Sequence, residues 1–168
     1  MVMAELSRKI EPLCTLEILN AMKAMHGLER YYFNVMPYDR LLQNTFPQNH
    51  FAIIFNTLPS FQSGLGHWNL LFSDKNSDNI TYLNSLNDDM DSEVQCIIEG
   101  RLKRGQCLIS NSVSLQKSYS TICGYICIYA LKWLIKGWSL DEIIKYKLEL
   151  MNFDEIENEV IKNYLELL

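Results

Sequence analysis

The sequence predicts an α+β domain in which helices pack around a central, mostly antiparallel sheet. Three observations support this fold class: helical spacing near the start, short apolar runs separated by polar turns in the middle, and helical spacing again toward the end. The 168 residues fit one domain, 1–168, because no repeat, low-complexity segment or linker divides them.

The first elements follow from local patterns. Apolar residues recur at helical spacing over 13–25, which predicts a helix. The aromatic, β-prone stretch 31–36 predicts a strand. The continuous apolar run 51–55 has strand length and predicts a central strand that is buried on both faces. Segment 57–66 contains proline and glycine breakers, so we expect a loop there.

A hairpin is predicted next, from strands 67–72 and 80–86 joined by a polar turn. If Phe72 faces Ile80, the antiparallel register places His67 opposite Ser85, one residue from Asn84. This geometry predicts that a carboxamide and an imidazole lie together at the open end of the hairpin.

The remaining elements are mostly helical. Segment 88–103 begins acidic and ends basic, which suits a helix and its dipole. Residues 107–110 predict a short strand. The sequence 139–142 forms a capping box that opens a helix, and 154–168 predicts a last amphipathic, acidic helix.

A buried helix is predicted with Ser120 or Thr121 as its cap, Cys123 in its first turn and an end near Gly137. In the first turn, unpaired N–H groups and the helix dipole favour a thiolate at Cys123. Gly124 has no side chain, so a substrate backbone could approach the sulfur. The alternative interpretation is that Cys123 is an ordinary core cysteine.

These residue types supply the parts of a cysteine nucleophile site. Cys123 would attack as the nucleophile, and His67 would act as base and then as acid. Asn84 would accept the imidazole N–H and fix its tautomer. Gln116 and the backbone N–H of Cys123 would form an oxyanion hole, and Trp68 would shield the pair from water. The alternative for His67 is a structural histidine at the start of a strand.

Composition excludes other classes of site and partner. The net charge of −5 argues against nucleic acid as the main partner. Five cysteines without a Cys-x-x-Cys pair, and three scattered histidines, indicate neither a disulfide framework nor a metal site. No signal peptide and no membrane-spanning apolar run is visible, so we expect an intracellular protein.

Several motifs, taken in order, are similar to the adenovirus-type processing protease and to the wider SUMO-protease-like clan. The similar segments are Gly66-His67-Trp68, Tyr82-Leu83-Asn84-Ser85-Leu86, Gln116 and Cys123-Gly124, with upstream matches at 27–33, Tyr38-Asp39-Arg40, Phe46-Pro47 and 52–56. The resemblance covers about residues 16–136. It implies a papain-like, SUMO-protease-like cysteine protease fold.

The resemblance also implies a function. Such enzymes are cysteine endopeptidases that cleave virion precursor proteins, among them capsid or core precursors, often after a glycine, within the host cell and the virion. Family members are activated by DNA and by a peptide disulfide-linked upstream of the glutamine, where this chain has Cys107. A plain strand cysteine is the alternative for Cys107, and the sequence itself requires no cofactor.

The chain departs from the family at two points, and two other functions remain open. Asn84 stands where the clan has aspartate or glutamate, so the imidazolium would lose a countercharge, and a degenerate interaction module is one alternative. The second alternative is an isopeptidase that removes ubiquitin-like modifiers, because the clan performs both reactions. Cys107 and Gln116 also lie at a different spacing than in the family.

Overall fold

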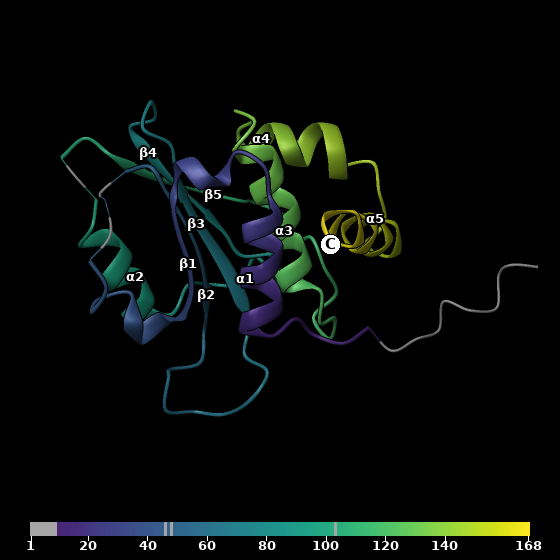
Figure 1. Ribbon diagram of the computed structural model, residues 1–168, viewed down its shortest axis with the longest axis horizontal. Helices are drawn as coiled ribbons and strands as arrows, with labels where there is room; N and C mark the ends of the chain where they lie inside the picture. Colours follow the sequence, from purple (N-terminus) through teal and green to yellow (C-terminus); the bar gives the residue numbers. More distant parts are fainter. Residues whose placement is uncertain (1–9, 46, 48, 103) are drawn as a thin grey trace, which may run out of the picture.

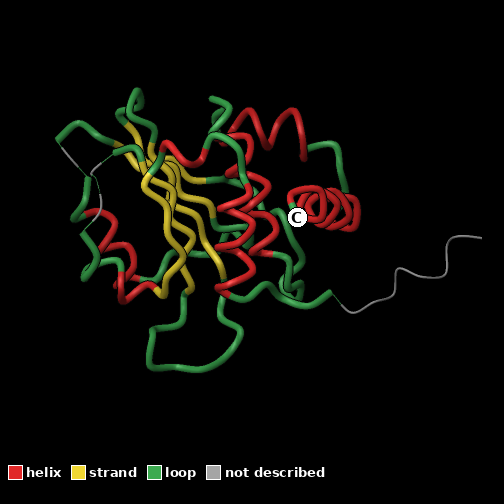
Figure 2. Tube along the Cα trace, in the orientation of Figure 1, coloured by secondary structure: helices red, strands yellow, loops and turns green. Residues whose placement is uncertain are grey.

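The computed structural model describes residues 10–168, except 46, 48 and 103. The start of the chain, Phe46 and Lys103 therefore lie outside the described residues. Within them, a five-stranded sheet lies between two helical layers (Figures 1 and 2). Helices α1 (Thr15–Ala24) and α3 (Cys123–Leu134) cover one face, and α2 (Ser92–Glu99) covers the other.

The sheet has the order β1-β2-β3-β4-β5. Its strands are β1 (Tyr32–Pro37), β2 (Phe51–Asn56), β3 (Trp68–Ser73), β4 (Asn79–Leu83) and β5 (Cys107–Ser110). The two inner pairings are antiparallel, as expected, but β1 with β2 and β4 with β5 are parallel. The sheet is therefore mixed, because the connections before β2 and β5 carry the chain back to the same end.

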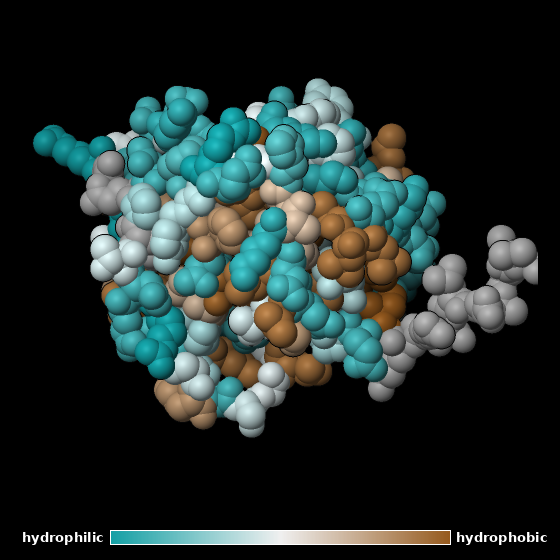
Figure 3. Space-filling model, in the orientation of Figure 1, coloured by the Kyte–Doolittle hydropathy of each residue, from teal (hydrophilic) through white to brown (hydrophobic). Residues whose placement is uncertain are grey.

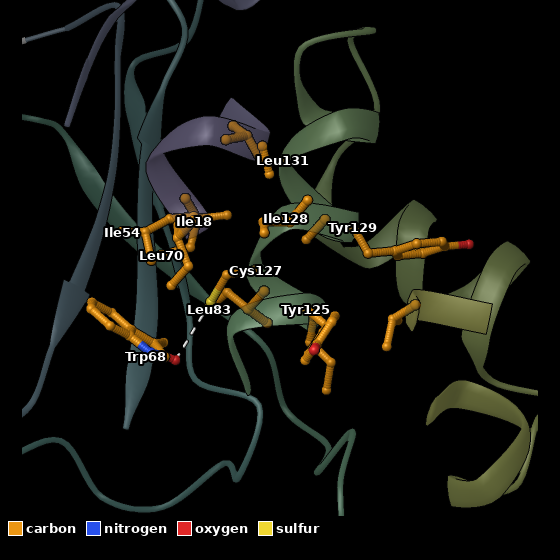
Figure 4. Close-up of a cluster of buried hydrophobic side chains, with 14 of the residues drawn as sticks. Ile18, Ile54, Trp68, Leu70, Leu83, Tyr125, Cys127, Ile128, Tyr129 and Leu131 are labelled. Carbon is orange, nitrogen blue, oxygen red and sulfur yellow. Dashed lines mark hydrogen bonds between the residues drawn. The ribbon is translucent and has the colours of Figure 1, made fainter. Parts of the chain in front are cut away.

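Burial on both faces of the sheet follows from the apolar runs. Strand β2 is buried over Phe51–Phe55, which confirms the predicted central strand. One core cluster joins the sheet to α1 and α3, and a second joins its other face to α2. Figure 4 shows the first cluster, in which Ile54, Leu70 and Leu83 of the sheet lie near Ile18 of α1 and Ile128 of α3.

The register of the β3–β4 hairpin differs from the predicted one by one residue. Phe72 pairs with Thr81, not with Ile80. Residues directly opposite share a face of the sheet, and Phe72 packs toward α3 while Ile80 packs toward α2. A one-residue slip would therefore place one of these two apolar side chains on the wrong face, and burial on both faces selects the observed pairing.

The C-terminal helices largely follow the prediction. They are α4 (Leu140–Ile143), a π-helical turn η3 (Ile144–Leu148) and α5 (Phe153–Leu167), while short 3₁₀ turns η1 (Leu28–Arg30) and η2 (Tyr38–Arg40) flank β1. The capping box at α4 is confirmed: Ser139 Oγ accepts the N–H of Glu142 at 3.2 Å, and the Glu142 carboxylate accepts the N–H of Ser139 at 2.8 Å.

The surface mixes polar and apolar side chains. Figure 3 shows apolar patches interspersed with polar ones over the visible face. Some apolar residues are largely exposed, including Phe61 and Leu65 in the loop between β2 and β3. Among the described residues, no helix has both the length and the apolar character needed to cross a bilayer.

Candidate active site

The site lies where the start of β3 meets the end of β4. His67 directly precedes β3 and is partly buried, and Asn84 directly follows β4 and is 7% exposed. His67 Nε2 lies 3.0 Å from Asn84 Oδ1. The two side chains meet in spite of the shifted register, because Asn84 lies beyond the last paired residue, Leu83, where the chain is already turning.

The orientation of the Asn84 amide decides the tautomer of His67. Asn84 Nδ2 donates to the carbonyl of Asp88 at 3.2 Å, and Oδ1 also accepts the N–H of Leu86 at 3.1 Å. The oxygen therefore faces the imidazole, and because an amide oxygen can only accept, His67 carries its proton on Nε2. The lone pair of Nδ1 is then the one that can take a proton.

Asn111 holds the main chain at Asn84 in place. It follows β5, is 5% exposed, and its Oδ1 accepts the N–H of Asn84 at 3.0 Å. Its Nδ2 donates to the carbonyls of Asn84 at 2.7 Å and Val113 at 3.0 Å. Asn111 is not evident from the sequence, since only its position directly after a strand distinguishes it from the other asparagines.

Cys123 is the first residue of α3 and is 5% exposed. The backbone N–H of Trp68, the residue after His67, donates to Cys123 Sγ at 3.5 Å. The sulfur is thus held against the strand that carries the histidine. One helical turn later, the buried Cys127 Sγ donates to the carbonyl of Trp68, also at 3.5 Å (Figure 4).

The cap of α3 differs from the prediction. Ile122 is the N-cap residue, and no side chain caps the helix. Thr121 Oγ1 instead donates to the carbonyl of Ile10 at 3.0 Å, and Ser120 Oγ donates to Glu157 at 3.3 Å. No side-chain cap therefore occupies the N–H groups of the first turn, which an oxyanion hole at Cys123 would require.

Burial determines the pKa values of the two reactive groups. It raises the pKa of the Cys123 thiol, although the backbone N–H groups of Trp68, Gly124 and Cys123 act in the opposite direction. It also lowers the pKa of His67, against the Asn84 hydrogen bond and the negative charge of Asp88. In this state burial therefore favours the thiol at Cys123 over the expected thiolate, because desolvation outweighs the hydrogen bonds from these N–H groups.

Gln116 is anchored beside the start of α3. Its side chain is 2% exposed, and its Oε1 accepts from Ser85 Oγ at 2.7 Å. Its Nε2 donates one hydrogen to the carbonyl of Ser120 at 2.9 Å. The amide nitrogen carries a second hydrogen, which is the one that an oxyanion would need. The role of Ser85 as the anchor of this amide is not evident from the sequence.

Gly124 packs in the core, which differs from the expected space for a substrate. A Cβ at this position would lie 3.3 Å from Leu13 Cβ, Ile18 Cδ1 and Trp68 Cδ1. The missing side chain therefore lets α3 pack closely against α1 and β3. Trp68 is 5% exposed, and its Nε1 donates to the carbonyl of Leu13 at 2.9 Å.

A cavity of about 330 Å³ lies beside Trp68, which forms part of its lining. The rest of its lining comes from residues just before and within the start of α1, from the loop between β2 and β3, and from the last residues of β1 and β2. In Figure 1 this loop projects from the same end of the sheet as the start of α1. The cavity thus borders Trp68, the residue whose backbone N–H contacts the sulfur of Cys123.

Cys107 lies apart from this constellation in the fold, as the exposed first residue of the edge strand β5. Its backbone N–H donates to Asn79 Oδ1 at 3.3 Å. Within the part of the chain that the structure describes, all five cysteines are free and no group of His, Cys, Asp and Glu side chains could hold a metal ion.

Comparison with known proteins identifies similar folds. No protein-family model matches the sequence, and no curated protein matches it. The crystal structure of ASFV pS273R protease superposes with a TM-score of 0.64 and 17% identity over 89% of this chain. ChlaDub1 from Chlamydia trachomatis superposes with a TM-score of 0.62 and 14% identity over 94% of this chain.

The share of each neighbour that is matched differs. This chain spans 66% of the length of the ASFV protease and 92% of that of ChlaDub1. At these identities the similarity shows the fold alone. The predicted α+β fold, with helices flanking a central sheet, is thereby confirmed, whereas the resemblance to SUMO-protease-like and adenovirus-type enzymes remains a prediction from the sequence motifs.

Proposed function

We propose that this chain is a cysteine endopeptidase in which Cys123 is the nucleophile and His67 is its general base. One observation carries the proposal. His67 is hydrogen-bonded to Asn84, and the next residue, Trp68, donates its backbone N–H to the sulfur of Cys123. A base, its orienting group and a thiol, which are distant in sequence, thus converge at one end of the sheet.

The reaction would begin from a neutral Cys123 thiol and a neutral His67 imidazole, since burial favours both uncharged forms. Nδ1 of His67 takes the proton of the thiol as the sulfur attacks the scissile carbonyl carbon. The negative charge moves to the carbonyl oxygen, where the N–H of Cys123 and Nε2 of Gln116 stabilise it. The C–N bond then breaks, and the imidazolium gives its proton to the leaving amine.

The second half of the reaction returns the enzyme to its starting state. His67 takes a proton from a water molecule, whose oxygen attacks the thioester carbon. The C–S bond breaks, the sulfur regains a proton from the imidazolium, and the carboxylic acid product leaves. Throughout, Asn84 holds Nε2–H, so that Nδ1 stays directed to the reacting atoms.

The substrates that we favour are viral precursor proteins, including capsid or core precursors, cleaved in the host cell and the virion. The sequence motifs that resemble adenovirus-type proteases support this choice, as does the fold shared with the ASFV protease. The cavity beside Trp68 would accept part of the polypeptide. The same proposal includes an activating peptide that forms a disulfide with Cys107. The side chain of Cys107 is exposed, so such a peptide could reach its sulfur.

The second candidate function is removal of ubiquitin-like modifiers. A modifier tail ending in Gly-Gly needs a narrow channel beside the nucleophile, and Trp68 would form a wall of that channel, since it contacts the sulfur through its backbone N–H and lines the neighbouring cavity. Cleavage of modifier conjugates, with no cleavage of Gly-x-Gly peptides or precursor proteins, would favour this candidate.

An activity probe tests the enzyme proposal directly. We expect a thiol-reactive peptide probe to label Cys123, and both His67→Ala and Cys123→Ala to abolish labelling and peptide cleavage while the circular dichroism spectrum is unchanged. Cys96→Ser changes an exposed cysteine on α2 and is the matched control, with full activity expected. Labelling that persists in His67→Ala would remove His67 as the base, and no selective labelling of Cys123 would support the interaction module instead.

A further inference from the structure

The segment before α1 runs beside the candidate active site as an extended strap, which we define as residues 10–13. Figure 1 shows this segment running past the end of α3 at which that helix begins. Leu13 is 5% exposed and belongs to the core cluster that includes Cys123, and Ile10 packs against the same cluster. The strap is therefore a packed part of the fold next to the site.

Three side chains donate hydrogen bonds to the carbonyls of the strap. Thr121 Oγ1 donates to Ile10 at 3.0 Å, Tyr125 OH donates to the carbonyl of residue 11 at 3.1 Å, and Trp68 Nε1 donates to Leu13 at 2.9 Å. Irregular backbone near a core needs such partners, because unpaired carbonyls are costly to bury.

The three donors lie close in sequence to the two proposed reactive residues, Cys123 and His67. Thr121 lies two residues before Cys123 and Tyr125 two residues after it, so two donors bracket the nucleophile on α3. Trp68 directly follows His67 on β3. The strap thus joins the strand that carries the base to the helix that carries the sulfur, in addition to the core packing between them.

We infer that residues 10–13 are a positioning element, which keeps Cys123 within reach of His67 for proton transfer. Its role in turnover rests on the proposed function, but its effect on the cysteine–histidine pair does not. Small displacements between reacting groups reduce rates strongly, so loosening the strap lowers reactivity before it unfolds the chain. The acceptors are backbone carbonyls, which substitutions cannot remove, so the strap is tested through its donors, Thr121 before α3, Tyr125 on α3 and Trp68 on β3.

The test removes two donors in the full chain: Thr121, just before α3, and Tyr125, in its first turn. Thr121→Val and Tyr125→Phe delete hydroxyl groups and keep the side-chain shape. In the double variant we expect faster amide exchange in the peptide that contains the strap, and a turnover number reduced on the order of tenfold, for two neutral hydrogen bonds. Thr121→Ser keeps the hydroxyl and should retain activity, and Tyr146→Phe, at an exposed tyrosine, is the matched control.

The pH profile of Cys123 alkylation separates a positioning role from a structural one. We expect the profile of the double variant to move toward that of His67→Ala, with an unchanged far-UV spectrum. Unchanged exchange in the strap, or a loosened strap with the profile of the unmodified chain, would overturn the inference. If the unmodified chain already has the profile of His67→Ala, the proposed function fails instead.

Discussion

At the residue scale, Asn84 presents a neutral amide oxygen, not a carboxylate, to the imidazole of His67. A negative charge that favours the imidazolium comes from Asp88, whose carboxylate raises the pKa of His67. The backbone carbonyl of Asp88 also accepts a hydrogen bond from the Asn84 amide. The site therefore orients its base through hydrogen bonds and stabilises the imidazolium through a charge outside the direct contact. This arrangement makes protonation of His67 sensitive to substitutions at both positions.

The first prediction concerns the pKa of His67, measured by NMR titration of the ring in a Cys123→Ala background. Burial lowers this pKa in the folded chain, so protonation opposes folding and stability falls as pH drops below the ordinary histidine value. Asn84→Asp adds an adjacent negative charge and should raise the pKa, whereas Asp88→Asn should lower it further.

Asp89→Asn is the matched control for that titration, because Asp89 is an exposed neighbour of the same charge. It should shift the pKa of His67 less than Asp88→Asn does. Equal shifts for the two aspartates would mean that His67 senses only the general charge of this turn.

The second prediction concerns Gln116. Gln116→Ala removes a donor from the proposed oxyanion hole and should reduce kcat about a hundredfold with little change in KM. Ser85→Ala keeps the amide but removes the hydroxyl that anchors it, so its effect on kcat should be smaller. Steady-state kinetics on one peptide substrate measure both, and an unchanged kcat for Gln116→Ala would remove this residue from the site.

At the element scale, the start of α3 combines close packing with an uncapped first turn. Ile122 provides no side-chain cap, and Thr121, one of the two expected caps, bonds to the strap instead. Close contact of Gly124 with Leu13 and Trp68 holds this helix start against α1 and β3. The sulfur is placed by these contacts and by the backbone N–H of Trp68.

The third prediction tests that packing through Gly124→Ala. The new methyl group would lie 3.3 Å from Leu13 Cβ and Trp68 Cδ1, neither of which is the free end of a flexible side chain. Overpacking should outweigh the better helix propensity of alanine, for a net destabilisation of about 1 kcal/mol. Thermal unfolding should then show a Tm lower by roughly 2–4 °C, and an unchanged or higher Tm would mean that the contact relaxes freely.

At the scale of the whole molecule, the sheet topology assembles the site. Strand β3 is antiparallel to β4, so its start lies beside the end of β4, and β5 is parallel to β4, so its end lies there too. His67, Asn84 and Asn111 therefore gather at one end of the sheet, although they lie far apart in the sequence. The parallel pairing of β5 is what places Asn111 beside Asn84.

The fourth prediction follows from the net charge of −5. Duplex DNA should not accelerate peptide cleavage, since an acidic chain gains little from releasing phosphate counterions. Cleavage rates with and without DNA at two salt concentrations measure this. Acceleration by DNA that disappears at higher salt would contradict the prediction and would point to a local basic surface, whatever the net charge.

Local patterns were sufficient for much of the fold. The apolar run of β2, the helical spacing of α1 and α3 and the capping box at Ser139 each depend on neighbours in the sequence, and each appears as predicted. The hairpin was predicted too, but not its register, because that depends on which core each face of the strands meets.

The sequence by itself determined the strands and helices of this chain and the residue types available for a thiol site, because periodicity, breakers and motif spacing are local properties. Only the tertiary structure decided the register, the raised pKa of Cys123, the packed role of Gly124 and the contacts of Asn111 and the strap. These depend on burial and on hydrogen bonds between distant segments, and such interactions exist only once the elements have packed together.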